Sequence, residues 1–283
     1  MTKAGLEGQT WLITGASAGI GRALGEAVIA RGGNLVATAR NPANLDGLVA
    51  LAPDRVLATR LDVTDQAQID EALAAAEARF GQVDVVVNNA GFGFLAAIEE
   101  ASDAEVRTLF DANVFGLAAV TRSVLPAMRK RGAGRIINIS SMSGFRASPG
   151  VGYYAASKWA VEAMSEALAK EVALLGIGVL IVEPGPFRTD FAGRSLLRPA
   201  NEIADYTVAN QIRAGSQKGS GNEPGDPVRA AEQIIDTALA GTQLRLVVGQ
   251  MGYDGIIGAL DERKQSVELS RELAGQADFP VGT

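Results

Sequence analysis

Tyr154 and Lys158 lie four residues apart in the stretch "YYAASKWAVEAM", which has the pattern of a helix. Residues four apart on a helix share a face, so both side chains can reach one bound molecule. A phenol is a poor base near neutral pH, and lowering its pKa by roughly two to three units needs roughly 3–4 kcal/mol. A lysine ammonium about 4 Å away supplies up to roughly 4 kcal/mol at an effective dielectric near 20. The pair indicates proton transfer, although an aromatic–cation pair on a helix surface has the same spacing.

The composition leaves few other groups for such chemistry. The 283 residues include no cysteine and no histidine, so we expect no disulfide, no thiol nucleophile and no metal site. Proton transfer must then use Tyr, Lys, Ser or carboxylates. The formal net charge of −6 is not the footprint of a nucleic-acid-binding protein. No apolar run has the length of a signal peptide or a membrane span, and we expect a soluble, cytoplasmic protein.

Short apolar runs alternate with helical segments along the chain. Sustained alternation of this kind predicts an α/β fold, with a doubly wound, mostly parallel, seven-stranded sheet (Rossmann-like) and helices on both faces. The runs are nearly continuous hydrophobics, as expected for strands covered on both faces. The expected strands are residues 10–14, 34–39, 55–63, 83–90, 135–140, 178–184 and 244–249.

We interpret residues 1–283 as a single domain with two additions. Residues 191–226 are poor in strand signals and end in a Gly/Pro/polar stretch. Another helix and strand follow them, so they are expected to form a substrate loop or lid rather than a linker. Residues 251–283 have the pattern of a charged, amphipathic, helical C-terminal extension.

Three glycines, Gly15, Gly19 and Gly21, follow the first expected strand and open the first helix. Glycine lets the backbone turn sharply and approach a pyrophosphate closely, and a helix N-terminus offers free N–H groups to phosphate. The spacing is G-x-x-x-G-x-G rather than the G-x-G-x-x-G fingerprint. Its position between strand and helix nevertheless predicts a dinucleotide site.

The end of the second expected strand bears on the choice of dinucleotide. NAD-binding folds place a carboxylate there, which hydrogen-bonds the ribose 2′-hydroxyl. Here the strand ends at Ala39 and is followed by Arg40. A guanidinium pairs with a 2′-phosphate, so the sequence favours NADP(H) over NAD(H). A solvated arginine is the alternative.

Seven short motifs occur in order along the chain. They are TGASAGIG (14–21), LDV (61–63), NNAG (88–91), NVFG (113–116), NISS (138–141), YAASK (154–158) and PGPFRT (184–189). On these motifs the chain resembles the short-chain dehydrogenases/reductases, from about residue 8 to about residue 250. Ala18 departs from the arginine or lysine of many NADP-dependent members, so the NADP preference rests on Arg40, helped by Ser17.

The resemblance implies a cofactor site along one edge of the sheet. Asp62 and Val63 would contact adenine, and the segment 89–91 would line the groove. The loop 184–189 would hold the nicotinamide end. The implied cofactor-binding residues are Gly15, Ser17, Gly19, Ile20, Gly21, Arg40, Asp62, Val63, Asn89, Ala90, Gly91, Tyr154, Lys158, Pro184, Gly185 and Thr189.

The resemblance also implies catalytic roles for Asn113, Ser141, Tyr154 and Lys158. In the reductive direction Tyr154 would protonate the developing alkoxide while Ser141 hydrogen-bonds the same oxygen. Lys158 would lower the tyrosine pKa and hold the nicotinamide ribose, and Asn113 would hold a water that links Lys158 to solvent. Ser141 has the family's distance to Tyr154, unlike the neighbouring Ser140 and Ser143.

The expected function is an oxidoreductase acting on a small carbonyl or alcohol substrate. The apolar residues around the site and in the lid favour a hydrophobic substrate, and the resemblance implies a homodimer or homotetramer. Two alternatives are an NADP(H)-binding redox sensor or scaffold without turnover, and an epimerase or dehydratase of the same family. The residues considered for the substrate pocket are Phe92, Phe94, Met142, Phe145, Tyr206 and Val208.

Overall fold

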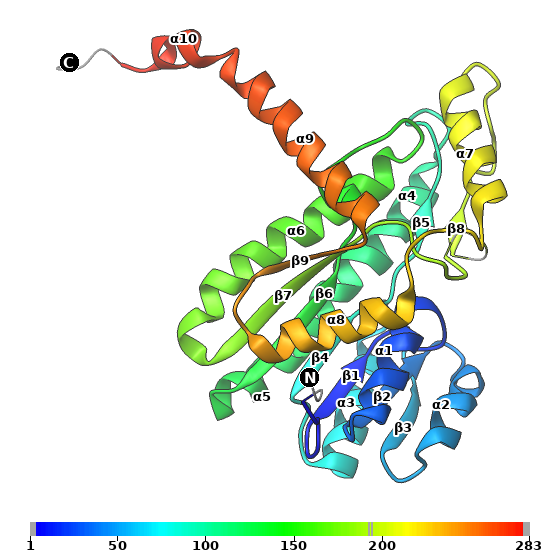
Figure 1. The fold of residues 1–283 in the computed structure, drawn as a ribbon, viewed down its shortest axis with the longest axis vertical. Helices are drawn as coiled ribbons and strands as arrows, with labels where there is room; N and C mark the ends of the chain where they lie inside the picture. The colour runs from blue at the N-terminus through cyan, green and yellow to red at the C-terminus, as the bar shows by residue number, and fades with distance from the viewer. Residues whose placement is uncertain (1–3, 192, 194, 280–283) are drawn as a thin grey trace.

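A seven-stranded sheet lies at the centre of the molecule (Figure 1). The structure is a computed structural model that describes residues 4–191, 193 and 195–279. The strand order is β3-β2-β1-β4-β6-β7-β9, and every neighbouring pair is parallel. This confirms the expected fold class. The strands are β1 Thr10–Ile13, β2 Asn34–Ala39, β3 Val56–Arg60, β4 Val85–Asn88, β6 Gly134–Ile139, β7 Ile177–Pro184 and β9 Arg245–Val248.

Helices cover both faces of the sheet (Figure 1). Alternate residues of a strand face opposite ways: Trp11 and Ile13 belong to one buried cluster and Leu12 to the other. Helices α1, α2 and α8 pack on the first cluster, and α3, α5 and α6 on the second. The helices are α1 Gly19–Ala30, α2 Asp46–Leu51, α3 Gln66–Phe80, α4 Asp103–Phe110, α5 Leu117–Arg131, α6 Gly152–Val172, α7 Thr207–Gly219, α8 Pro227–Ala240, α9 Gln250–Glu268 and α10 Arg271–Ala274.

The order of the strands determines where a ligand can bind. The chain builds β1, β2 and β3 outward in one direction, then returns to place β4 on the other side of β1. The helices that follow β1 and β4 therefore leave the sheet in different directions, and a crevice opens at the carboxyl ends of these strands. The glycine loop follows β1 and the segment 89–91 follows β4, so both belong to this edge.

The segment 191–226 contains a helix that its sequence did not make evident, α7. A short strand of the segment, β8 (Leu196–Leu197), pairs in parallel with β5 (Gly93–Phe94). The side chain of Arg213 on α7 forms an ion pair with Glu100, and the two side chains are 2% and 0% exposed. The insert is thus joined to the body by backbone hydrogen bonds and by a buried charge pair.

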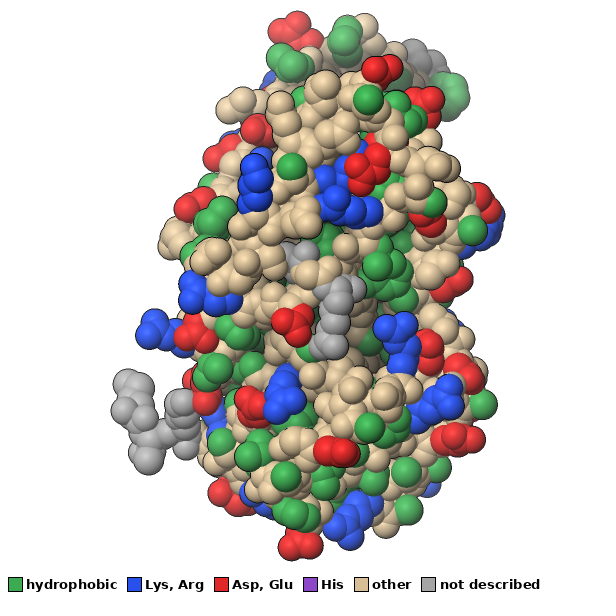
Figure 2. Space-filling model, turned by 90° about the vertical axis from the view of Figure 1, so that its right-hand side faces the viewer, with side chains coloured by type: hydrophobic (Ala, Val, Ile, Leu, Met, Phe, Trp, Pro, Cys, Tyr) green, Lys and Arg blue, Asp and Glu red, His purple; other side chains and the backbone are tan. Residues whose placement is uncertain are grey.

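The first turns of helix α9 lie against the body. Figure 1 shows its distal part and α10 projecting away from the sheet. Its first turns pack closely: a Cβ on Gly252 would lie 2.8 Å from the nitrogen of Gly185, and one on Gly255 would lie 2.8 Å from Cε of Met142. The extension therefore contacts the loops after β7 and β6. Among the described residues, no helix is long and apolar enough to cross a membrane. Figure 2 shows acidic and basic side chains interspersed on the face that it draws.

Candidate active site

The glycine loop is shaped by close contacts that only glycine allows. Gly15 and Gly19 have positive φ angles of 68° and 57°, a region that L side chains rarely adopt. A Cβ on Gly15 would lie 3.1 Å from Cα of Ala90, and one on Gly21 would collide with the amide of Asn89. The loop consequently packs directly on the residues that follow β4.

The start of helix α1 fits a pyrophosphate. Its N-cap is Ala18, and no side chain among the described residues caps the helix. The first N–H groups of a helix have no intrahelical acceptor, and they are the groups that bind phosphate in dinucleotide sites. The bare backbone at Gly19 and the uncapped helix end are therefore suited to a dinucleotide.

Asn89 has a supporting role that sequence reasoning missed. Its Nδ2 donates to the carbonyl oxygens of Thr14 and Gly15, at 2.9 and 3.1 Å. The Thr14 hydroxyl in turn accepts from the backbone nitrogens of Asn89 and Ala90, both at 3.0 Å. These bonds join the end of β1 to the end of β4 and hold the glycine loop. Thr14 opens the motif TGASAGIG, and that position was the available signal.

The remaining expected cofactor residues lie along the same edge. Arg40 is exposed directly after β2, and none of the described residues forms an ion pair with it. Asp62 follows β3, where its Oδ1 accepts from the backbone and hydroxyl of Thr64 at 3.1 and 2.8 Å. A Cβ on Gly19 would lie 3.5 Å from Cβ of Thr189, so the loop after β7 approaches the glycine loop. Val63 and Ile20 differ from these polar groups, since both pack on the hydrophobic clusters.

Three of the four expected catalytic side chains come from the end of β6 and the start of α6. Ser141 follows β6, and Tyr154 and Lys158 lie in the first two turns of α6. The hydroxyls of Ser141 and Tyr154 are hydrogen-bonded. The Nζ of Lys158 donates to the carbonyl oxygen of Ile139 at 2.9 Å and lies 5.9 Å from the centre of the Tyr154 ring. The structure brings these three side chains together as the sequence predicts.

Asn113 lies in a π-helical turn, Asp111–Gly116, between α4 and α5. Its Oδ1 accepts from the nitrogen of Phe92 at 3.0 Å, and its Nδ2 donates to the oxygen of the same residue at 2.9 Å and to Oγ of Ser157 at 3.2 Å. A Cβ on Gly91 would lie 2.8 Å from Oδ1 of Asn113 and 3.9 Å from Nζ of Lys158. Asn113 therefore lies near the lysine and also holds the segment after β4. The expected water stays a prediction.

The protonation of the pair differs from the expectation. Burial raises the pKa of Tyr154 to about 12, and the hydrogen bond with Ser141 opposes this only in part. The Phe191 ring, whose centre is 6.1 Å from that of Tyr154, contributes to the apolar surroundings. Burial also lowers the pKa of Lys158 to about 8, against the attraction of Glu162. Desolvation dominates both groups, and Lys158 is not among the causes of the shift in the Tyr154 pKa.

A network of buried polar side chains joins the strands and helices that carry the site. Two of its members, Asn88 and Asn138, belong to the sequence motifs but were assigned no role from the sequence. Nδ2 of Asn88 donates to Oδ1 of Asn138 at 2.8 Å and to the hydroxyl of Thr121 at 3.0 Å. Nδ2 of Asn138 donates to the hydroxyl of Ser165 at 2.8 Å. All four side chains are buried. The network joins β4 and β6 to α5 and α6 and thereby fixes the strand ends that carry the site.

An ionic cluster was also missed. Arg245 on β9 forms ion pairs with Glu162 and Glu166 on α6 and with Glu183 on β7, the last at 2.6 Å. Burial raises the pKa of Glu183 to about 7, although Arg245 opposes this. A signal was present, because Glu183 and Arg245 interrupt otherwise apolar strands and Glu162 lies four residues after Lys158.

The residues considered for the substrate pocket divide into two groups. Phe94 is buried with Ala96 and Leu109 and belongs to the core. Arg245 stacks on Phe145 at 5.0 Å, so this ring is part of the ionic cluster's surroundings. Phe92 packs on the same small core cluster as Tyr154, and Met142 adjoins Ser141 and α9.

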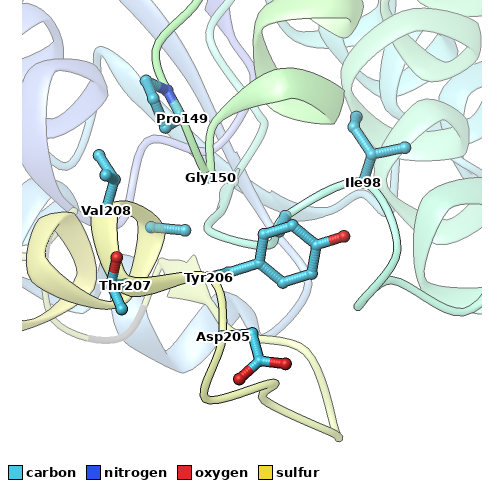
Figure 3. Close-up of a pocket in the computed structure, with 9 residues that line it drawn as sticks. Ile98, Pro149, Gly150, Asp205, Tyr206, Thr207 and Val208 are labelled. Carbon is cyan, nitrogen blue, oxygen red and sulfur yellow. The ribbon is translucent and has the colours of Figure 1, made fainter.

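A hollow of about 350 Å³ lies beside the start of α7 (Figure 3). Figure 3 shows the Tyr206 ring on one side of it, with Pro149 and Val208 on another. Gly150, which also lines the hollow, lies in the turn that leads into α6. Five residues of the segment 191–226, including the expected Tyr206 and Val208, thus line a cavity next to the turn that leads into α6. The cavity is lined by Ala97, Ile98, Pro149, Gly150, Asp205, Tyr206, Thr207, Val208 and Ala209.

Comparison with known proteins identifies the class. The family model described as short chain dehydrogenase matches residues 9–198, well over half of the chain. The chain belongs to the short-chain dehydrogenase family. It is accordingly an oxidoreductase, and the chemistry of the family is hydride transfer between a nicotinamide dinucleotide and a CH–OH or C=O group.

Individual relatives match over most of their length. Oxidoreductase BOA17 of Botryotinia fuckeliana is 35% identical over 268 residues, which are 92% of this chain and 98% of that protein. The solved structure of a short-chain dehydrogenase from Streptomyces avermitilis has 43% identity and a TM-score of 0.88, covering 95% of this chain and 100% of that one. A short-chain dehydrogenase/reductase from Burkholderia phymatum, solved in complex with NAD, has 25% identity and a TM-score of 0.81, covering 95% and 97%.

Proposed function

We propose that this protein is an NADP(H)-dependent reductase of carbonyl compounds, with Tyr154 as the general acid. The observation that carries the proposal is the meeting of Ser141, Tyr154 and Lys158 beside the uncapped start of α1. The nicotinamide, when bound, supplies or accepts the hydride. This chain supplies the proton, the orientation of the reacting oxygen and the exclusion of water.

The protonation states favour the reductive direction. With a pKa of about 12, Tyr154 carries its proton at neutral pH and can donate it to an oxygen that becomes negative. Ser141 hydrogen-bonds Tyr154 and can donate to the same oxygen, which stabilises the developing charge. Lys158, with a pKa of about 8, is mainly cationic at neutral pH. Its charge favours the tyrosinate that remains after transfer.

We propose NADP(H) rather than NAD(H) because of Arg40. The guanidinium is exposed at the end of β2, and no described carboxylate pairs with it. A 2′-phosphate at this position would gain a charge-assisted hydrogen bond. The Burkholderia phymatum relative was solved with NAD, so cofactor choice within this family needs a direct test.

We propose a hydrophobic substrate that the segment 191–226 encloses as a lid on a single domain of residues 1–283. Phe191 faces the Tyr154 ring, and β8 places Leu196 against Gly93. Both contacts put apolar side chains of the insert beside the reacting groups. The Arg213–Glu100 pair supports this placement because it joins α7 to the segment after β5.

We also propose a homodimer or homotetramer through helix α6 and its neighbour. Trp159 on α6 and Phe115 before α5 are 41% and 60% exposed. Large exposed apolar side chains on adjacent helices are typical of an interface. Sedimentation at micromolar concentration tests this, and a Trp159→Asp, Phe115→Asp double variant is expected to sediment as a smaller species.

The decisive experiment for the proposed function follows NADPH oxidation with a panel of hydrophobic ketones, aldehydes and quinones. Tyr154→Phe is expected to retain NADPH affinity and to lose roughly 10²- to 10⁴-fold in turnover, because general acid catalysis is of that size. Arg40→Ala is expected to weaken NADPH binding roughly 10- to 100-fold and NADH binding little. Equal losses for both nucleotides would contradict the NADP assignment, and near-normal turnover of Tyr154→Phe would contradict the role of the tyrosine.

A further inference from the structure

Glu162 lies one helical turn beyond Lys158 on α6, and both side chains are buried. Residues at i and i+4 are neighbours on a helix surface. A buried carboxylate beside a buried ammonium acts through a medium of lower dielectric than water, where charges interact more strongly. The attraction of Glu162 accordingly raises the pKa of Lys158, against the larger effect of burial.

Only one of the two carboxylate oxygens of Glu162 has a partner among the described residues. Its Oε2 pairs with Arg245, while its buried Oε1 has no hydrogen-bond partner among the described residues. A Cβ on Gly144 would lie 2.9 Å from this Oε1 and 2.8 Å from the hydroxyl of Ser140, which also has no partner there. The free oxygen thus faces the turn that carries Ser141, and glycine at position 144 leaves space for it.

Within the cluster, Glu162 is the carboxylate best placed to act on Lys158. Arg245 is shared, among the described residues, by Glu162, Glu166 and Glu183. Burial raises the pKa of Glu183 to about 7, which weakens its negative charge below that pH. Glu166 is 47% exposed, so water screens its charge. Glu162 is buried and lies on the same helix as the buried Lys158, so its charge is the one expected to stabilise the ammonium.

We propose that Glu162 is a positioning residue that keeps the buried Lys158 in its charged form during catalysis. This inference rests on the proposed function of Lys158, but it concerns a residue outside the serine–tyrosine–lysine set. The carboxylate is too far along the helix to act on the substrate itself, and it acts through the lysine. Without it, burial would leave more of the lysine as a neutral amine near neutral pH.

The test measures the titration of Lys158 directly. The chain has six lysines, so protein labelled with ¹³C at lysine Cε has few NMR signals, and a Lys158→Arg variant assigns the relevant one. In Glu162→Gln the titration midpoint of Lys158 is expected to fall by about one pH unit, the order expected for loss of a partly screened charge one turn away. Circular dichroism checks that each variant is folded.

Glu166→Gln is the matched control. Glu166 lies on the same helix and pairs with the same Arg245, but its side chain is 47% exposed. Its replacement is expected to leave the Lys158 midpoint within about 0.3 pH units, because water screens an exposed charge. Glu162→Asp keeps the charge and is expected to retain most of the wild-type midpoint, which provides a second variant if Glu162→Gln does not fold.

A midpoint unchanged in Glu162→Gln, or shifted equally in Glu166→Gln, would overturn the inference. The titration needs neither cofactor nor substrate, so it is independent of the proposed function. Failure of NADPH binding or of the Tyr154→Phe effect would contradict the function and leave the titration intact. Where both hold, the alkaline loss of reductase turnover is expected to move to lower pH in Glu162→Gln in step with the lysine midpoint.

Discussion

Two buried ionic sites of this protein use the same residue types and shift carboxylate pKa values in opposite directions. Beside α7, Glu100 pairs with Arg213, which also lies 3.7 Å from the half-exposed Glu202, and accepts from the backbone nitrogens of Ala97 and Ile203 at 2.7 and 2.8 Å. Its pKa falls to about 2, chiefly because of the hydrogen bond from Arg213. Behind the active site, burial raises the pKa of Glu183 to about 7.

The difference follows from stoichiometry. Glu100 is the buried one of the two carboxylates beside Arg213 and also accepts two N–H groups, so its charged form is well satisfied. At Glu183 three carboxylates compete for Arg245, and the nearby charge of Glu162 adds to the cost of burial. The first arrangement holds a segment in place. The second places two buried carboxylates close together, at some cost in stability near neutral pH.

The largest expected effect comes from breaking the Glu100–Arg213 pair. Glu100→Ala removes the buried partner of the buried Arg213 guanidinium, and breaking a buried pair in this way costs about 3–5 kcal/mol. Because α7 lies outside the central sheet, we expect rapid proteolysis and fast hydrogen exchange over residues 207–219 before the global transition. If the amides of α7 exchange as slowly in Glu100→Ala as in wild type, apolar contacts alone are sufficient to keep α7 packed on the body.

A smaller effect, dependent on pH, is expected for Glu183→Gln. The folded-state pKa of Glu183 lies above the ordinary glutamate value of 4.5, so its contribution to stability is fully present below about pH 4.5 and is lost as the pH rises through about 7. The variant removes this loss. Its free energy of unfolding relative to wild type is therefore expected to increase from pH 5 to pH 8 in urea titrations.

Glu100→Gln gives the opposite comparison. The folded-state pKa of Glu100 is about 2, below the ordinary glutamate value of 4.5, so its stabilisation is present above about pH 4.5 and is lost as the pH falls toward 2. The deficit of Glu100→Gln is thus expected to be constant from pH 5 to pH 8. A deficit that varies over this range, or a Glu183→Gln difference that does not, would contradict the contrast between the two sites.

The smallest effect is expected at an exposed pair. Arg107 and Asp103 on α4 are joined at 2.6 Å, but their side chains are 73% and 79% exposed. Water and salt screen an exposed i,i+4 pair, so its contribution to stability is small. Asp103→Asn is expected to leave the urea midpoint almost unchanged, and 1 M salt is expected to remove any difference. A loss comparable to that of Glu100→Ala would mean that burial does not separate the two classes of pair.

Local sequence was sufficient to predict most of the fold and much of the site. The strand β2 has the predicted bounds, because a continuous apolar run between turn signals has few alternatives. β3 ends at Arg60, earlier than predicted, since the backbone nitrogen of Asp62 bonds the side chain of Gln68 instead of continuing the sheet. That bond depends on a partner from the next helix, which strand propensity does not register.

The segment 191–226 contains elements that the sequence did not predict. The segment lacks strong periodicity, yet it contains α7 and a strand that pairs with β5. Both depend on partners that are distant in the sequence. Arg213 forms an ion pair with Glu100, more than a hundred residues away, and Leu196 pairs with Gly93. Elements stabilised by such contacts have a weak local signal.

The sequence by itself determined the fold class, the glycine loop and the placement of Tyr154 and Lys158 on one face of a helix, because strand–helix alternation, backbone freedom and helical spacing are local properties; Ser141 was assigned only through the resemblance to the family. Tertiary structure decided the protonation of these groups. The pKa of Tyr154 is raised and that of Lys158 is lowered by burial, and the charge that opposes the latter comes from Glu162, within a cluster that β7 and β9 complete. Desolvation and charge balance depend on which segments meet in space, and that is a property of the folded chain alone.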